Sequence, residues 1–501
     1  MTTDARRHRR TTVTALALAT VTVLATTAAA TACGGAAGAA GTAGTAGTAD
    51  AVPPERPARA SVQGVWRTDG YGTIVAVEGR RLRSYETTRG SCLPGALTAT
   101  RSGPVGPDGG AEFAPGEDSD YDRVTVTPEP GGRTARLRIA SSVGDRVLHR
   151  LPGVPRTCER EPADDPRAVF DVFWRTYAEN YPFFAAKGID WNAVRDRYRP
   201  RVTAGTTDDQ LFAILRDMIE PLHDTHTGLI AGKDRRYAGH RQDTEFPTAE
   251  SIARIDKATA ESVGAEQRRW AQGALSYADL PGRIGYLRIT RFAGFTDKGD
   301  YASAAAELDK ALDSVLTEQR TEGPERLRGL VIDLRFNGGG SDRLGVRLAS
   351  RLTDRPYIAY TKHARNDPDD PGQFTPGRRI RVRPHGDRPV YSGPVAVLTG
   401  RLTVSAGETF TQALMGRTPA PTRIGENTQG AFSDTLDRTL PNGWSFILPN
   451  EEFRTAEGTT FDGAGIPPDI RTPVFTDEEF AKHRDSALAR ARALLTVKSR
   501  D

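Results

Sequence analysis

The sequence predicts a multidomain α+β protein that contains a small antiparallel β-domain, a helical segment and an α/β core. Residues 61–160 hold short runs of alternating apolar and polar residues between Gly and Pro turns, which is typical of antiparallel strands. Over 161–232 the apolar spacing becomes helical. Over 283–475 apolar strands alternate with helical patterns, which indicates a largely parallel sheet.

The N-terminus has the pattern of an export signal over residues 1–33. Four arginines precede an apolar run over 13–30, and small residues lead to Cys33. This ending resembles a bacterial lipobox, which implies a lipid-modified Cys33 and a membrane partner; the alternative is an ordinary signal peptide cut near Ala32. We therefore expect an exported protein, held on the outer face of the cell membrane or secreted. Residues 34–60 are rich in Gly, Ala and Pro and predict a disordered tether.

The net charge bears on which binding partners are possible, and the cysteine content bears on disulfide formation. The formal charge is +4, and removal of residues 1–32, with four Arg and one Asp, leaves 4 − 3 = +1. A nearly neutral chain offers no electrostatic case for nucleic acid. Cys92 and Cys158 are expected to form a disulfide in an exported chain, with two free thiols as the alternative.

The segment 161–232 places aromatic residues at helical spacing, which favours a packed core over a cofactor site. It ends in a loop that carries His223, Asp224, Thr225 and His226. Residues 233–282 are polar and poorly periodic, so we expect an insertion or a flap over a cleft. Residues 476–501 predict a last helix, polar enough to be a surface cap.

Four strands are expected in the core, at 284–289, 330–334, 357–360 and 395–398. Working groups in parallel sheets gather at the carboxyl ends of strands. The loops that follow Leu334 and Thr399 lie at such ends. The first contains three consecutive glycines, and the second leads to Ser405.

After the last of these strands, Ser405 stands where a helix would begin, and Glu408 follows with the spacing of a capping box. The free N–H groups and the positive end of the helix dipole at this position suit a nucleophile whose product is an oxyanion. The alternative is that Ser405 only caps the helix.

A serine nucleophile needs a base. No lysine occurs between Lys362 and Lys482, so a lysine base shortly after Ser405 is unavailable. Among the histidines, His226 is the best choice because it lies at the end of an element, although a purely structural role is the alternative. A metal site with His223 lacks a third ligand at familiar spacing, so we expect no metal and no cofactor.

The loop at 333–340 reads DLRFNGGG and follows a buried strand. Three glycines allow close backbone approach and leave N–H groups free. A phosphate cradle would need the Lys and Ser/Thr of a P-loop, which are missing. An oxyanion hole fits better, and a tight turn alone is the remaining alternative.

Five stretches, in this order, resemble the S41 serine peptidases, a family that includes the C-terminal processing peptidases and the tricorn protease core. They are HDTHTG at 223–228, DLRFNGGG at 333–340, LTVSAGE at 402–408, GENTQG at 425–430 and GAGIPPD at 463–469. The resemblance implies a ClpP/crotonase-like α/β peptidase core over 283–475.

The missing lysine makes the chain similar to the tricorn-type branch, which uses serine and histidine. The resemblance then implies Ser405 as nucleophile and His226 as base. Thr225 stands where that branch has a serine that links the histidine to an acid, and the acid position falls on Asp462, where the branch has glutamate. The oxyanion donors that the resemblance implies are the N–H of Ala406 and that of Gly339 or Gly340.

These features predict a serine endopeptidase that acts on peptides or proteins through an acyl-enzyme on Ser405. The alternative from another class is a non-catalytic S41-fold protein that binds a hydrophobic ligand or a peptide. A third hypothesis is an esterase that uses the same serine nucleophile. No PDZ pattern is evident in the 233–282 segment. Oligomeric state has no signature in the sequence.

Overall fold

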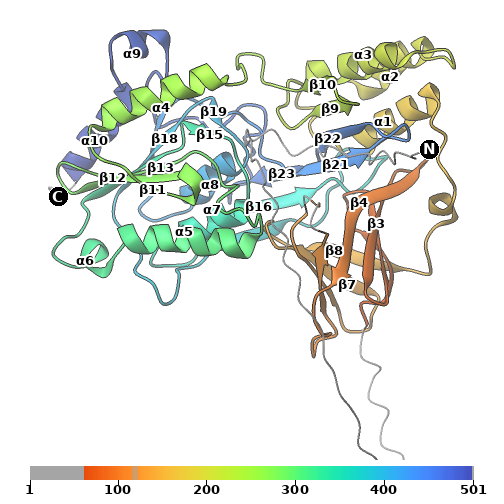
Figure 1. Cartoon of the computed structure of the whole chain (residues 1–501), viewed down its shortest axis with the longest axis horizontal. Helices are drawn as coiled ribbons and strands as arrows, with labels where there is room; N and C mark the ends of the chain where they lie inside the picture. The colour runs from red at the N-terminus through yellow and green to blue at the C-terminus, as the bar shows by residue number, and fades with distance from the viewer. Residues whose placement is uncertain (1–60, 117–118, 120, 499–501) are drawn as a thin grey trace, which may run out of the picture.

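The computed structural model describes residues 61–116, 119 and 121–498. The predicted signal over 1–33, Cys33 and the tether over 34–60 lie outside these residues. Within the described part, no helix is long and apolar enough to span a membrane. Figure 1 shows a β-barrel below a larger α/β body, with the first helices at one end of that body.

The N-terminal β-domain is a closed antiparallel barrel of eight strands in sequence order, in which β1 also pairs with β8. Buried apolar side chains such as Trp66, Phe113 and Leu148 fill its interior. Cys92 in β4 and Cys158 are bonded, as predicted, with sulfur atoms 2.02 Å apart. The strands are β1 (Gly64–Thr68), β2 (Thr73–Glu78), β3 (Arg81–Thr87), β4 (Cys92–Arg101), β5 (Ala111–Pro115), β6 (Val124–Pro128), β7 (Thr134–Ile139) and β8 (Arg146–Leu151).

The helical segment comprises α1 (Pro166–Asn180), α2 (Trp191–Tyr198) and α3 (Asp208–Ile219). Its aromatic residues form a core with a four-stranded sheet in the order β10-β9-β22-β21. The sheet joins β9 (Gly228–Ala231) and β10 (Arg235–Ala238) to β21 (Thr435–Thr439) and β22 (Ser445–Pro449). Segments some two hundred residues apart therefore meet beside the histidine loop.

The core sheet has seven strands in the order β11-β12-β13-β14-β18-β20-β24, and the five from β13 onward run parallel. The expected strand at 357–360 exists, but it belongs to a separate antiparallel sheet, β17-β16-β23. The core strands are β11 (Arg268–Trp270), β12 (Leu275–Leu280), β13 (Ile284–Ile289), β14 (Gly329–Asp333), β18 (Val395–Thr399), β20 (Thr422–Gly425) and β24 (Ile470–Arg471). The smaller sheet contains β16 (Tyr357–Ala364), β17 (Arg378–Val382) and β23 (Glu451–Arg454).

Helices cover both faces of the core sheet. On one face, α5 (Tyr301–Val315), α7 (Asp342–Ser350) and α8 (Ala406–Met415) contribute to a common apolar cluster with alternate residues of β14 and β18. On the other face, α10 (Ser486–Lys498) contributes Ala487, Leu488, Ala491 and Leu495. The last helix is therefore not the polar surface cap that we expected, because its four small and apolar residues pack on the sheet.

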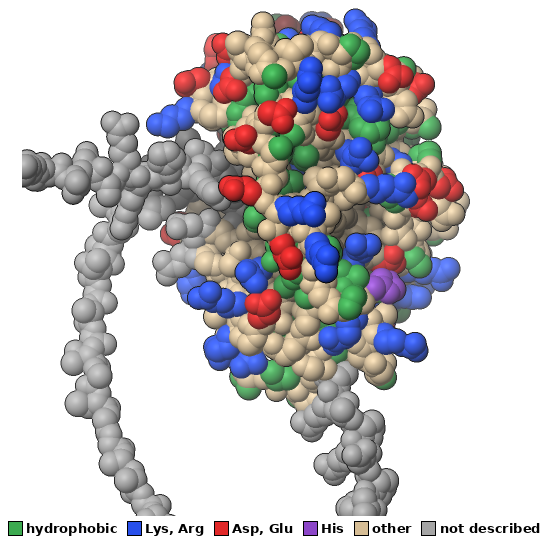
Figure 2. Space-filling view, turned by 90° about the vertical axis from the view of Figure 1, so that its right-hand side faces the viewer, with side chains coloured by type: hydrophobic (Ala, Val, Ile, Leu, Met, Phe, Trp, Pro, Cys, Tyr) green, Lys and Arg blue, Asp and Glu red, His purple; other side chains and the backbone are tan. Residues whose placement is uncertain are grey.

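The predicted insertion at 233–282 is only partly an insertion. It contains α4 (Ala249–Val263), but β12 pairs antiparallel with β13 and β11 pairs antiparallel with β12, so both strands extend the core sheet. Other short elements include α6 (Glu318–Thr321), β15 (Phe336–Asn337), β19 (Leu402–Thr403) and α9 (Asp477–Ala481). Figure 2 shows that acidic and basic side chains are interspersed on the face it presents, with hydrophobic ones scattered among them.

Candidate active site

Ser405 occupies the residue before α8, at the end of the path that leads from β18 through β19. Its φ of 54° is positive, a conformation that costs a side-chain-bearing residue on the order of 1–3 kcal/mol. Its backbone N–H donates to the Ala431 carbonyl at 3.0 Å, and the helix behind it is buried through Leu414. The predicted helix start is confirmed, and the turn holds Ser405 in a half-buried, fixed position.

Glu408 fastens this turn to the loop at 428–431. Its buried carboxylate accepts the N–H groups of Gly430 at 2.6 Å, Ala431 at 2.8 Å and Ser405 at 3.2 Å. Burial raises the pKa of Glu408 to about 7, against the lowering effect of these hydrogen bonds. The backbone position of Ser405 therefore depends on one carboxyl group that titrates near neutral pH.

The glycine loop lies against Ser405, and its N–H groups differ in availability. The Gly338 N–H donates to the Thr290 carbonyl and the Gly339 N–H to the Asn337 Oδ1, both at 3.0 Å. Among the described residues, no acceptor is recorded for the N–H of Gly340 or for that of Ala406. Of the three predicted donors, Gly339 is therefore occupied, whereas Gly340 and Ala406 are free.

His226 lies in the loop between the short helix η3 (Glu220–Leu222) and β9. The side chain is buried, and its Nδ1 has no hydrogen-bond partner among the described residues. Burial lowers the pKa of His226, while the carboxylates of Asp224 and Asp434 act in the opposite direction. Asp224 is itself fixed by the His226 backbone N–H at 3.0 Å and by the Tyr181 hydroxyl at 2.9 Å.

The predicted link from Asp462 through Thr225 to the histidine is not formed. The Thr225 hydroxyl accepts from the Gln429 side chain at 2.8 Å. The Asp462 carboxyl instead accepts the Phe432 N–H at 3.3 Å and the Thr460 hydroxyl at 2.9 Å. Burial raises the pKa of Asp462 well above its usual range, and the nearby Asp224 carboxylate adds to this.

No hydrogen bond between Ser405 and His226 is recorded in the described structure. His223 is exposed in the left-handed region, with φ of 46°. Gln429 is a site residue that the sequence patterns did not predict. It lies inside the GENTQG stretch at 425–430, which would have been its only signal.

A cavity of about 290 Å³ opens beside these loops. Thr225, Gly338, Val404 and Gln429 line it where it borders the candidate site. Much of the remaining lining is apolar and comes from the loop before α4, from α4 and from β15 and β19: Phe246, Pro247, Ile252, Ala260, Phe336 and Leu402. The volume is at the lower end of the range for ligand pockets.

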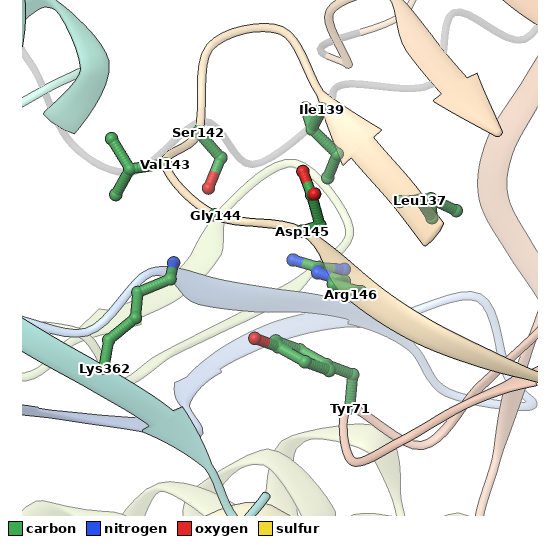
Figure 3. A pocket seen from close by; sticks show the side chains of 9 residues that line it. All are labelled: Tyr71, Leu137, Ile139, Ser142, Val143, Gly144, Asp145, Arg146 and Lys362. Atoms are coloured by element: carbon green, nitrogen blue, oxygen red, sulfur yellow. The ribbon is translucent and has the colours of Figure 1, made fainter. Parts of the chain in front are cut away.

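The barrel contacts this region through a buried polar cluster, of which Figure 3 shows Lys362 of β16 and, from the barrel, Tyr71 and Ser142. The Lys362 ammonium lies 3.2 Å from the Asp434 carboxylate and 3.1 Å from that of Glu451. From the barrel, Ser142 donates to Asp434 at 2.9 Å and the Tyr71 hydroxyl donates to Glu451. Asp434 thus connects the barrel loop to the surroundings of His226.

Fold and site together define an α/β protein with a serine at a strained strand-to-helix turn, beside a glycine loop. Residues 283–472 match the family model described as Peptidase family S41, and residues 162–220 match that of the Tricorn protease C1 domain. The core at residues 283–472 therefore belongs to the S41 peptidase family.

Three similar proteins illustrate this membership. A carboxyl-terminal-processing protease from Picosynechococcus is 26% identical over 191 residues, 38% of this chain and 39% of the relative. A chloroplastic carboxyl-terminal-processing peptidase 2 from Arabidopsis thaliana is 28% identical over 207 residues, which are 39% of this chain and 34% of the relative. This chain therefore matches less than half the length of either relative. A solved protein from Parabacteroides merdae, described as a candidate peptidase, shows 27% identity and a TM-score of 0.54 over 66% of this chain and 97% of its own.

Proposed function

We propose that the protein is a serine peptidase that hydrolyses peptide bonds through an acyl-enzyme on Ser405. One observation carries the proposal: Ser405 precedes a buried helix in a positive-φ turn, and the N–H groups of Ala406 and Gly340 have no acceptor among the described residues. Free backbone donors beside a serine hydroxyl are what an oxyanion intermediate requires. Family membership supports the same chemistry.

In the proposed mechanism Ser405 attacks the peptide carbonyl while His226 accepts its proton. The tetrahedral oxyanion is bound by the N–H groups of Ala406 and Gly340. His226 then protonates the leaving amine, and water releases the acyl group by the reverse steps. Catalytic hydrogen bonds often tighten only when substrate is bound, so we expect the Ser405 to His226 contact to form in the complex.

Two carboxyl groups, those of Asp462 and Asp224, are candidates for the acid of this site. Asp462 is the position that the family resemblance implies, yet its carboxyl bonds Thr460 and Phe432. Asp224 is fixed next to His226 and acts on its charge. We propose that the acidic environment of His226 stabilises its protonated form during the reaction.

A second candidate function is ligand binding without catalysis. Its support is the apolar lining of the 290 Å³ cavity, which suits a hydrophobic ligand or an apolar peptide. Ligand binding alone forms no oxyanion at Ser405, so it does not account for the two free N–H groups beside this serine.

Labelling with a fluorophosphonate probe separates the two functions. We expect one label per folded molecule, located on Ser405 by mass spectrometry, and none on Ser405→Ala. Ser350→Ala serves as the control, because this serine bonds its own helix at the Arg347 carbonyl. A folded wild-type protein that takes no label would contradict the peptidase proposal and favour binding.

We also propose that the protein is exported and anchored through a lipid on Cys33. The support is the pattern of residues 1–33 alone. Mass spectrometry of the mature N-terminus is expected to find a diacylated Cys33. An unmodified terminus near Ala32 would instead indicate a secreted protein.

A further inference from the structure

The 290 Å³ cavity has a wall of arginines that the proposed mechanism does not use. The lining includes Arg269 of β11, Arg288 of β13 and Arg291, which follows Thr290. Arg269 and Arg288 both lie opposite Ser276 of the intervening strand. Residues opposite one another in antiparallel strands share a face, so these two side chains lie in one row on the cavity side.

Only one of the three guanidinium groups is neutralised. Arg288 pairs with Asp256 of α4 at 2.6 Å. Within the described part of the chain, the hydrogen bonds recorded for the Arg291 side chain go to main-chain carbonyls, those of Ala293 at 3.1 Å and Gln272 at 3.2 Å. No ion pair of Arg269 or Arg291 is recorded within residues 61–116, 119 and 121–498.

Besides Asp256, the cavity lining contains one acidic residue, Glu245, and a single carboxylate does not neutralise the charge of two arginines. Glu245 lies on the exposed loop before α4, away in sequence from the strands that carry the arginines. Among the described residues no ion pair is recorded for Glu245 either, so the cavity lining holds two arginines and one glutamate outside ion pairs. Burial lowers the pKa of the Arg291 guanidinium, and no neighbouring carboxylate opposes this shift. A partly buried cation without a counter-ion gains free energy when an anion binds to it.

Arg291 is also tied to the candidate catalytic loop. The residue before it, Thr290, accepts the Gly338 N–H at 3.0 Å, and the residue after it, Phe292, donates to the Gly339 carbonyl at 2.6 Å. Gly338 and Val404, the neighbour of Ser405, line the same cavity. A group bound by Arg291 is therefore within a few peptide residues of Ser405, since each extended residue spans about 3.3–3.6 Å.

We propose that Arg291, together with Arg269, forms a subsite that binds a carboxylate of the substrate polypeptide. The planar guanidinium matches a carboxylate in a bidentate way, and the apolar lining beside it accommodates neighbouring side chains. This inference rests on the proposed peptidase function for the nature of the ligand. The carboxylate is either an Asp or Glu side chain or the free C-terminus of the substrate.

The experiment compares three pools of short fluorescent peptides. One pool has amidated C-termini and contains Asp and Glu; the second is amidated and contains Asn and Gln instead; the third contains Asn and Gln but has free C-termini. Binding to Ser405→Ala is measured by fluorescence anisotropy, and kcat/KM is measured with the wild type. We expect one carboxylate pool to bind about 10- to 100-fold more tightly than the amidated Asn/Gln pool, as a charge-assisted hydrogen bond permits.

The variants decide whether Arg291 is responsible. Arg291→Gln is expected to abolish the preference and Arg291→Lys to keep part of it, because lysine retains the charge. Arg268→Gln is the matched control: it is adjacent in β11 and donates to the Ser314 carbonyl instead of lining the cavity. Melting temperatures report whether each variant folds.

The pool that is preferred identifies the source of the carboxylate. Equal binding of all three pools, or an unchanged preference in Arg291→Gln, overturns the subsite. If peptides bind with the expected preference but the wild type cleaves none, the peptidase proposal fails while the subsite stands.

Discussion

Gly339 and Ser405 are packed so closely that a Cβ atom on Gly339 would lie 2.7 Å from the Cβ of Ser405 and 3.2 Å from its Oγ. The φ of Gly339, +85°, also disfavours any side chain. Gly339→Ala must therefore displace the serine or the glycine loop. We expect kcat to fall on the order of 10²–10³-fold, as when an oxyanion donor is lost, in a peptide hydrolysis assay.

The neighbouring glycine supplies the control for this prediction. A Cβ on Gly338 would meet no atom within 4 Å, and its φ is not positive. Gly338→Ala is expected to fold and to react with the fluorophosphonate probe at nearly the wild-type rate. Equal losses at both positions would mean that the close approach to Ser405 has no catalytic consequence.

His226→Ala is expected to lower kcat by on the order of 10⁴-fold or more, because the loss of a base from such a unit removes most of its catalysis. His223→Ala changes an exposed side chain three residues away and should have little effect. A larger loss at His223 would transfer the role of base to that residue.

The pH dependence of kcat/KM tests the same histidine in another way. A base must be unprotonated, and burial lowers the pKa of His226 below its ordinary value of 6.5. Activity should therefore be retained as pH falls to 6.5 and be lost at lower pH. An acid limb centred above pH 6.5 would contradict the assignment.

Glu408 is expected to make stability depend on pH. Its pKa is about 7 in the folded protein, compared with 4.5 in the unfolded chain. The folded state binds the extra proton between these values, so this stabilisation is fully present below pH 4.5 and is lost as pH rises through 7. The shift corresponds to at most about 3 kcal/mol in the free energy of unfolding.

Urea unfolding at pH 5 and pH 8 measures this effect against Glu408→Gln. The glutamine cannot ionise in this range, so the variant should lose less stability than the wild type between the two pH values. The same decrease in both proteins would show that Glu408 stays protonated, or stays charged, over the whole range.

Local patterns in the sequence were sufficient for much of the fold. Several barrel strands, such as β3, β6 and β7, alternate buried and more exposed residues. The stretch from β18 to Ser405 has the apolar run and the cap spacing of a strand followed by a helix. β11 and β12 were missed because polar residues that face the cavity, such as Arg269 and Ser276, interrupt their apolar pattern. α10 was misjudged because arginines separate the residues that it buries.

The candidate site was predictable where one segment forms it and unpredictable where distant segments meet. The turn at Ser405 and the glycine loop are local. The partner of the Thr225 hydroxyl is not, because Gln429 reaches it from 204 residues away, and Asp462 bonds its own neighbours instead. The arginine wall likewise exists only after β11 and β13 pair with β12.

Lys362 is expected to be essential for joining the barrel to the core. It is buried between Glu451 and Asp434, and both carboxylates also accept hydrogen bonds from the barrel. Lys362→Met leaves these carboxylates without a counter-ion, which should cost about 3–5 kcal/mol in the free energy of unfolding. The control is Lys310→Met, which removes an exposed lysine 3.3 Å from Glu307 and should cost less than about 1 kcal/mol. Adding Glu451→Gln to Lys362→Met should restore part of the loss in a urea titration, because it removes one of the unpaired charges. If Lys362→Met unfolds at the same urea concentration as Lys310→Met, the buried cluster does not hold the barrel in place.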